Sequence, residues 1–307
     1  MTGIVLEKMI TLVLIMLLGF GCAKAGWIDD GFSQKASLLV MNVFIVGTIL
    51  RSVANVQTTL TSRELALCAA ASFLVFLIGG ALGWLAARLL PFQGRDRKVA
   101  WLSVFFMNNV FIGFPVVEAL FGQSGVFCAS LTNLPFNLLL YTVGVANLRQ
   151  GKGRGREKLR EVFSMPLLAT LAAVVLFLFQ IPVPELAADT LSILGAATVP
   201  MSMLVVGTSL SHVPIKEALL DGRAYLMSLV KLVLCPLATW WVLSLFLPED
   251  SLVLGVLTVI AACPSAAMIT ILCVRFGADG RLASKINFLS TLLCAVTLPI
   301  ITYFLLR

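Results

Sequence analysis

Residues 108–115 read Asn-Asn-Val-Phe-Ile-Gly-Phe-Pro and lie in the middle of a hydrophobic segment where a membrane-spanning helix should be uninterrupted. The second half of the chain carries a comparable interruption at residues 262–266, which read Ala-Cys-Pro-Ser-Ala. Asn109 is 13 residues before Gly122 of a Phe-Gly pair, and Pro264 is 13 residues before Gly277 of another. An unwound backbone in hydrocarbon costs several kcal/mol per unpaired peptide group, so it persists only where it lines a cavity that meets a substrate or ion. Two matched interruptions therefore predict a transporter.

The composition independently predicts a polytopic membrane protein. Hydrophobic residues make up 60% of the 307 residues and charged residues only 12%, with a mean hydropathy of +1.03. A water-soluble domain of this size does not have such a composition. The net charge of +7 is spread over short loops between apolar runs, without interleaved aromatic residues or a nucleic-acid-binding motif. The charge therefore indicates membrane topology, and no nucleic-acid partner is expected.

Apolar runs long enough to span a bilayer predict ten membrane helices, five in each half. In the first half they cover residues 4–22, 36–55, 64–89, 99–121 and 124–147. In the second half they cover residues 164–180, 187–211, 222–247, 251–275 and 282–305.

Basic residues orient these spans, because cytoplasmic loops are enriched in lysine and arginine. Placing the segment after the fifth span in the cytoplasm puts 17 of the 22 basic residues on that side. The predicted outer loops are acidic or neutral, as at residues 181–185 and 248–250. Both chain termini are therefore predicted outside, in a plasma membrane such as the inner membrane of a bacterium. An apolar run near the N-terminus is interpreted as a retained span, not a signal peptide, since a cancelling Glu7-Lys8 pair precedes it.

Five spans on each side of a cytoplasmic connection give the two halves opposite orientations, which is an inverted repeat. The predicted domains are a first five-helix repeat at 1–148, a basic linker at 149–162 and a second five-helix repeat at 163–307. The Gly/Lys/Arg-rich linker is interpreted as a solvated loop that fixes topology. A lipid-headgroup or partner site is the alternative.

The seven cysteines are scattered through or beside the apolar runs, and the chain has a single histidine, His212. Without a Cys-x-x-Cys pair or adjacent histidines, the cysteines are expected to be reduced packing residues. One interfacial imidazole makes neither a metal site nor a proton relay. No nucleotide-binding loop, nucleophile elbow or metalloprotease motif occurs, so we expect no enzyme activity, no cofactor and transport driven by a gradient.

The two interruptions have a definite chemistry if both unwind near the middle of the membrane. The positive ends of the half-helix dipoles and their free amide groups then point at the crossing, which favours an anion. The asparagines add amide donors, Ser265 adds a hydroxyl, and Gly113 permits close approach. The alternative is that the prolines only kink packed helices. The candidate substrate-binding residues are Asn108, Asn109, Gly113, Pro115, Pro264, Ser265 and Ala266.

Ionisable residues inside predicted spans are costly and are therefore candidates for function. Glu118 lies three residues after Pro115, on the same helix face, and could carry a proton in coupled transport. Lys231 could neutralise an anionic substrate or pair with a carboxylate. The alternatives are a helix-end position for Glu118 and snorkelling of Lys231 to the membrane surface. Arg51 is interpreted as an interfacial anchor.

The motifs together resemble the auxin efflux carrier family, over essentially the whole chain. This family includes plant auxin exporters and bacterial permeases for malate, malonate and related acids, in the bile/arsenite/riboflavin transporter superfamily. Residues 108–122 are similar to the family's fourth-span pattern, residues 196–211 to its seventh-span pattern, and residues 264–266 to its ninth-span break. Where many members have a proline in the second span, this chain has Val46-Gly47, whereas Pro200 fills the equivalent place in the second half.

The resemblance implies an all-α membrane fold of ten helices in two inverted repeats, with crossed, broken helices 4 and 9. It divides the fold into a scaffold domain and a transport domain, with substrate bound at the crossing and carried by an elevator-like displacement. The support-site role falls on Asn108 or Asn109, Pro115 and Pro264, with Ser265 adjacent. The short linker favours a permease of the bacterial type.

The leading functional hypothesis is a secondary active transporter of small organic anions, such as dicarboxylates or auxin-like acids. Membrane lipid is its other expected partner, and a homodimer is an open possibility for its assembly. The first alternative is a sodium-coupled symporter or a cation/proton antiporter of the related fold. It would need clustered acidic or hydroxyl ligands at the crossing, and Asp and Glu are absent from residues 108–115 and 263–266. The second alternative, a membrane enzyme or receptor, would need a catalytic constellation or a soluble domain, and neither is present.

Overall fold

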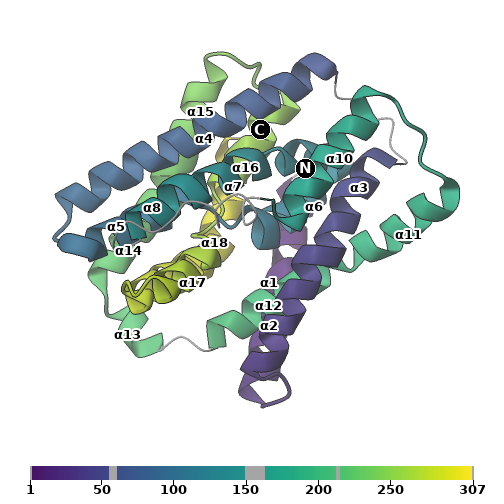
Figure 1. Cartoon of the computed structure of the whole chain (residues 1–307). Coiled ribbons are helices and arrows are strands. Elements are labelled where there is room, and N and C mark those ends of the chain that lie inside the picture. The colour runs from purple at the N-terminus through teal and green to yellow at the C-terminus, as the bar shows by residue number, and fades with distance from the viewer. Residues whose placement is uncertain (1, 55–60, 149–162, 212–214, 306–307) are drawn as a thin grey trace. The chain divides into compact units, whose positions relative to one another are not determined.

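The computed structural model describes residues 2–54, 61–148, 163–211 and 215–305, and this part of the chain is helical without a named strand (Figure 1). Six of its helices are long and apolar enough to cross a membrane. They cover Gly31–Ala54, Ser62–Leu89, Asn109–Ser130, Glu185–Ser211, Gly222–Ser244 and Gly280–Leu305. The predicted all-α class is therefore confirmed. The predicted basic linker at 149–162 and His212 lie outside the described residues.

The named helices do not match the ten predicted spans one to one, since α6 runs across the predicted boundary at 121–124 and the predicted span 187–211 is divided between α11 and α12. In the first half they are α1 (Thr2–Lys24), α2 (Asp30–Leu39), η1 (Val40–Phe44), α3 (Ile45–Ala54), α4 (Ser62–Leu89), α5 (Gly94–Phe105), η2 (Asn109–Gly113), α6 (Phe114–Ser130), α7 (Asn133–Leu139), η3 (Leu140–Gly144) and α8 (Val145–Leu148). In the second half they are α10 (Met165–Leu178), α11 (Glu185–Ala196), α12 (Thr198–Ser211), α13 (Ile215–Leu219), α14 (Gly222–Leu229), η5 (Val230–Leu234), α15 (Cys235–Ser244), α16 (Leu252–Ala261), α17 (Ala267–Arg275) and α18 (Gly280–Leu305). The η elements are single π-helical turns within longer helices.

Both Phe-Gly pairs adopt the same unusual backbone. Gly122 has a φ of 63° and breaks the helical geometry inside α6, and Gly277 has a φ of 64° directly after α17. A left-handed φ is open to glycine at no steric cost, which is why glycine ends helices so often. The two matching sequence signals therefore mark two matching chain turns.

The described helices divide into two compact units, and each unit takes segments from both halves of the sequence. Unit 1 comprises residues 1–69, 110–133 and 164–212, and unit 2 comprises residues 70–109, 134–163 and 213–307. Because the units mix the halves, neither of them corresponds to one predicted repeat.

In unit 1, α1 and α12 approach until their backbones touch. A Cβ atom added at Gly207 would collide with the Met16 carbonyl group, and one added at Gly19 would collide with the Leu204 backbone. Thr208 Oγ1 lies 3.4 Å from the Gly19 carbonyl oxygen across the same contact. Small residues allow apolar helices to associate in this way, since dispersion contacts and interhelical hydrogen bonds replace the hydrophobic effect in lipid.

A second helix contact in unit 1 joins α3 to α11 and the start of α12. The Thr48 hydroxyl is 2.7 Å from the Thr198 hydroxyl and 3.1 Å from the Gly195 carbonyl oxygen, and both threonines are fully buried. A Cβ atom added at Gly47 would stand 3.1 Å from the Gly195 nitrogen. The glycine of the Val46-Gly47 pair thus serves helix packing.

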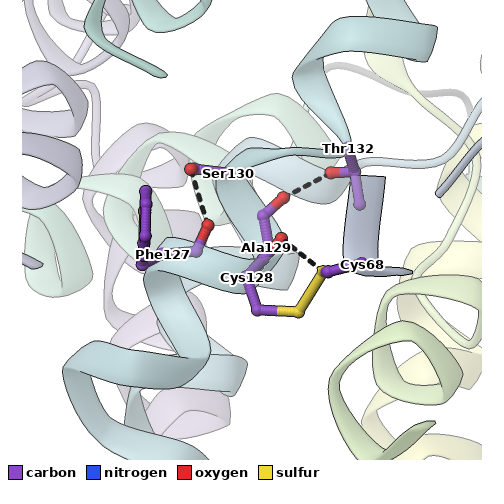
Figure 2. The surroundings of a disulfide bond; sticks show 6 residues. All are labelled: Cys68, Phe127, Cys128, Ala129, Ser130 and Thr132. Carbon is purple, nitrogen blue, oxygen red and sulfur yellow. Dashed lines mark hydrogen bonds between the residues drawn. A yellow bond between two sulfur atoms is a disulfide. The ribbon is translucent and has the colours of Figure 1, made fainter. Parts of the chain in front are cut away.

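Unit 1 also contains a disulfide between Cys68 of α4 and Cys128 of α6 (Figure 2). The expectation that all cysteines are reduced is therefore wrong for this pair. Both residues are buried. They are 60 positions apart, so no local motif such as Cys-x-x-Cys predicts the bond.

Two hydroxyl groups bond to carbonyl groups near the end of α6. Ser130 Oγ donates to the Phe127 carbonyl oxygen at 2.7 Å, and Thr132 Oγ1 donates to the Ala129 carbonyl oxygen at 2.6 Å. These hydroxyls satisfy carbonyl groups where α6 ends.

Unit 2 has an aromatic core. Phe76 of α4 packs edge-on against Phe105 at 6.4 Å and against Phe136 of α7 at 6.2 Å, and Phe105 and Phe106 are 4.7 Å apart. Trp101 Nε1 donates to the Gly80 carbonyl oxygen at 2.8 Å, joining α5 to α4. This cluster fixes the end of α5, where the first predicted interruption begins.

The disulfide predicts a specific thiol count and a stability effect. Five of the seven cysteines should react with a maleimide in SDS without reductant, and all seven after reduction. Cys68→Ser should lower the free energy of unfolding by about 2–4 kcal/mol, because the closed loop restricts the unfolded chain. Thermal denaturation in detergent measures this loss. Cys22→Ser is the control and should leave the melting temperature unchanged; seven reactive thiols before reduction would contradict the pairing.

The α1–α12 contact predicts opposite effects of two glycine-to-alanine changes. Gly21→Ala places its methyl group in open space and should be neutral or stabilising by up to about 1 kcal/mol, because alanine favours helix. Gly207→Ala forces α12 away from Met16 and should destabilise by about 1–3 kcal/mol, the usual cost of overpacking. Melting temperatures of the two purified variants test the difference, and equal values would show that the helices do not touch here.

Candidate functional site

The first interruption is a short non-helical segment between α5 and η2. α5 ends at Phe105, Phe106 is extended with φ −102° and ψ 128°, and helical structure resumes at Asn109. No proline stands at this point. Asparagine side chains compete with the backbone for hydrogen bonds and so weaken helix at Asn108 and Asn109. The buried aromatic residues before them hold the end of α5 in place.

The second interruption separates α16 from α17. α16 ends at Ala261, residues 262–266 are not helical, and α17 begins at Ala267. Pro264 has no amide hydrogen, and its ring disfavours helical geometry at Cys263, so the helix cannot continue through this point. The proline that marked this position in the sequence thus accounts directly for the break.

The two interruptions pair with each other inside unit 2. Met107 and Ser265 form an antiparallel β-bridge. The Asn108 amide donates to the Pro264 carbonyl oxygen at 2.8 Å, and the Ala266 amide donates to the Phe106 carbonyl oxygen at 3.0 Å. The structure therefore brings together the two stretches that the sequence singled out, and each supplies backbone partners that the other lacks.

A third element, α18, completes this pairing. The Ser265 amide donates to Ser290 Oγ at 3.1 Å, and Ser290 Oγ donates to the Asn287 carbonyl oxygen at 3.1 Å. Sequence analysis missed Asn287 and Ser290. A signal existed, because polar residues recur at positions 287, 290 and 291, the spacing of one helix face.

Several side chains around the paired segments are buried. Asn109 and Ser265 are each 1% exposed and Asn108 is 9% exposed. The hydroxyl oxygen of Ser265 has no hydrogen-bond partner, although polar atoms in protein interiors are nearly always paired. α17 starts after Ala266, whose side chain cannot cap the helix, so polar groups of a ligand could take that role.

Lys231 is the charged residue associated with this region. It lies in the π-helical turn η5, is fully buried, and its Nζ has no hydrogen-bond partner. The alternative that Lys231 snorkels to the membrane surface is therefore wrong. The thiols of Cys235, Cys263 and Cys294 are its titratable neighbours, and Cys263 belongs to the second interruption.

Gly113, Pro115 and Glu118 lie in unit 1, on η2 and α6, and not in the unit that contains the paired interruptions. Glu118 forms an ion pair with Arg51 of α3, and Gln123 Nε2 donates to the same carboxylate oxygen at 3.1 Å. Arg51 also donates to the Ser192 carbonyl oxygen at 3.3 Å and is 12% exposed. Arg51 thus joins α3 to Glu118 of α6.

Comparison of the sequence with known proteins shows the family to which the chain belongs. The sequence profile of the family described as "Membrane transport protein" matches residues 4–159 and 154–302. A protein from Methanothermobacter thermautotrophicus, named an uncharacterized transporter, is 27% identical over 298 residues, which cover 96% of each chain. Another uncharacterized transporter, from Methanocaldococcus jannaschii, is 26% identical over 296 residues and 93% of this chain and 94% of its own. The chain therefore belongs to the membrane transport protein family, the auxin efflux carriers that its motifs resemble, and is an integral membrane protein.

Proposed function

We propose that the protein is a secondary active transporter of small organic anions that works by elevator-type alternating access. The observation that carries this proposal is the pairing of the two interruptions through the Asn108, Pro264, Phe106 and Ala266 backbones. Membrane proteins tolerate non-helical backbone at depth only where it is buried in protein or lines a cavity, and transporters place substrate sites there. Membership of a transport family supports the same class.

The proposed fold is two inverted five-helix repeats with crossed, broken fourth and ninth spans. The positive-φ glycines 122 and 277 support it, because they lie 13 residues after Asn109 and Pro264 respectively, each of which belongs to one interruption. The composition of the two units also supports it, since an elevator needs a scaffold and a moving part that each draw helices from both repeats. On this proposal unit 2 carries the substrate.

The proposed substrate site takes its donors from the paired segments. Asn108, Asn109 and the Ser265 hydroxyl supply hydrogen bonds, while Pro264 and Ala266 shape the start of α17, where amide groups and the positive dipole end favour an anion. Gly113 and Pro115 lie on η2 and α6 of unit 1 and are candidates from the sequence motif alone.

A sodium-coupled mechanism is the alternative that the experiment must distinguish from the proposed function. Sodium sites are built from carboxylate, carbonyl and hydroxyl oxygens, and neither residues 106–109 nor residues 262–266 contain Asp or Glu. The described chain around the interruptions offers hydrogen-bond donors and one ammonium group instead, which suit an anion.

The proposed orientation places both termini outside. Beyond the distribution of basic residues, the Cys68–Cys128 disulfide supports it, because structural disulfides persist in oxidising compartments. Cys68 lies near the start of α4 and Cys128 follows Gly122, and the predicted topology assigns both of these chain turns to the outer side.

The test is uptake of labelled malate, malonate, lactate and indole-3-acetate into proteoliposomes, with pH, sodium and potential gradients imposed separately. Saturable uptake of at least one acid is expected, accelerated by a pH or potential gradient and not by sodium. Sodium-dependent uptake would establish the alternative. Absence of uptake of every acid by folded protein would refute the organic-anion proposal.

Asn109→Ala should reduce this uptake by about tenfold or more, since a hydrogen bond to a charged ligand contributes roughly 1.5–3 kcal/mol. Asn147→Ala is the matched control, because Asn147 Nδ2 donates to the Val143 carbonyl oxygen of its own helix at 2.9 Å. Arg154→Ala in the linker should also have little effect. Normal uptake by a folded Asn109→Ala protein would contradict the crossing-site assignment.

A further inference from the structure

Lys231 differs from every other described charged residue because its whole side chain is buried. It is the only charged residue among the buried residues that the structure describes, and its relative exposure is 0%. No hydrogen bond or ion pair of its Nζ is found in the described chain. An isolated ammonium group in a protein interior costs several kcal/mol unless an anion compensates it.

Among the described residues, the neighbours of Lys231 provide no such anion. η5 packs against α14, α15 and α18. From these elements and the second interruption, the titratable groups that interact with the ammonium are the thiols of Cys235, Cys263 and Cys294. α14 otherwise brings Arg223 and Tyr225, and α18 brings Arg281, Lys285 and Tyr303. Arg223 and Lys285 both engage Asp221, which is the first acidic residue before α14.

The local helix geometry brings Lys231 into this interior. A π-helical turn inserts an extra residue into an α-helix and redirects its side chains, and such turns occur frequently at functional sites. η5 spans Val230–Leu234 and interrupts the helix Gly222–Ser244 near its middle, so the ammonium group is far from both helix ends. Pro236, at the start of α15, removes one amide donor just after this turn.

We propose that Lys231 is both the counter-charge for the substrate and the proton carrier: it binds the carboxylate of a monocarboxylic acid and takes up one proton as that carboxylate arrives. This inference rests on the proposed function and names its substrate class and coupling. In the empty site the amine is neutral, and in the loaded site an ammonium–carboxylate pair is formed. One proton and one anion bind together, so the loaded site has the same net charge as the empty site.

Charge counting selects a monocarboxylate. A single buried cation compensates a single carboxylate, whereas the second carboxylate of malate or malonate would be left without a cation among the buried residues described. Leaving a buried charge unpaired costs far more than the pair itself gains. The thiols and the apolar residues near Lys231 suit an apolar remainder of the acid.

Proton and anion binding are then coupled by thermodynamic necessity. If protonated Lys231 binds the anion more tightly, the bound anion must favour protonation by the same factor. An inward proton gradient therefore drives uptake of the acid, and a membrane potential has no direct effect on the loaded carrier. The Ser265 hydroxyl, which lacks a partner two residues after Cys263, is available to the second carboxylate oxygen.

Three variants in proteoliposomes test this inference, with labelled indole-3-acetate and lactate as monocarboxylates and malonate as the dicarboxylate. Wild-type protein should take up a monocarboxylate in response to external acid, without response to a potassium–valinomycin potential, and should prefer it to malonate. Lys231→Met should raise KM by about 30-fold or more, the effect of losing one partner of a buried charge pair. Lys231→Arg keeps a permanent charge and should make uptake respond to the potential and lose its dependence on the pH gradient. Lys285→Met is the matched control, because Lys285 is partly exposed and paired with Asp221, and its pH response should equal that of wild type.

A direct measurement on wild-type protein does not depend on the folding of any variant. Adding indole-3-acetate or lactate to purified protein in weakly buffered detergent solution, with a pH indicator, should remove about one proton from solution per bound acid, as linkage requires. Binding without proton uptake would overturn the role of Lys231 and leave the transporter proposal intact. Acid-driven uptake by a folded Lys231→Met variant with unchanged KM would also overturn the role of Lys231. A preference of the wild-type protein for malonate over the monocarboxylates would do the same. If the wild-type protein neither binds nor transports any acid, the proposed function itself fails.

Discussion

The structure of unit 2 depends on one set of backbone hydrogen bonds, those between the two helix interruptions. A peptide group in the membrane interior has no water to bond, so each interruption alone would be prohibitively costly. The Asn108 amide and the Pro264 carbonyl satisfy one pair of groups, and the Ala266 amide and the Phe106 carbonyl satisfy another. Each break is therefore stable only in the presence of the other, which explains why the sequence carries two.

This mutual dependence leaves side chains free for another purpose. Because backbone groups satisfy backbone groups, the Ser265 hydroxyl is not required to complete the fold and has no partner there. The same holds for the Lys231 amino group, whose burial without a partner costs stability. Polar groups that are buried at such cost and contribute nothing to packing are expected where a ligand supplies the missing partner.

Local signals and long-range pairs differ in how far the sequence predicts them. Pro264 and the glycines 122 and 277 act on their own backbone. The second interruption and the two chain turns can therefore be predicted from the sequence. The Cys68–Cys128 disulfide and the Arg51–Glu118 pair each join helices that are distant along the chain, and nothing local specifies the partner. Ser290 was likewise missed, because its role depends on α18 lying against residues 262–266.

The two ionisable candidates from the sequence differ in one physical respect, their pairing. Glu118 is engaged by Arg51 and Gln123, so its charge is already compensated by helix α3 and its role in holding α3 to α6 requires no ligand. Lys231 has no compensation in the described chain and stands beside the second interruption. A group that must gain and lose charge during a transport cycle cannot be held permanently by a fixed partner of opposite sign. On the proposed mechanism, Lys231 is therefore the residue suited to coupling, while Glu118 joins α6 to α3.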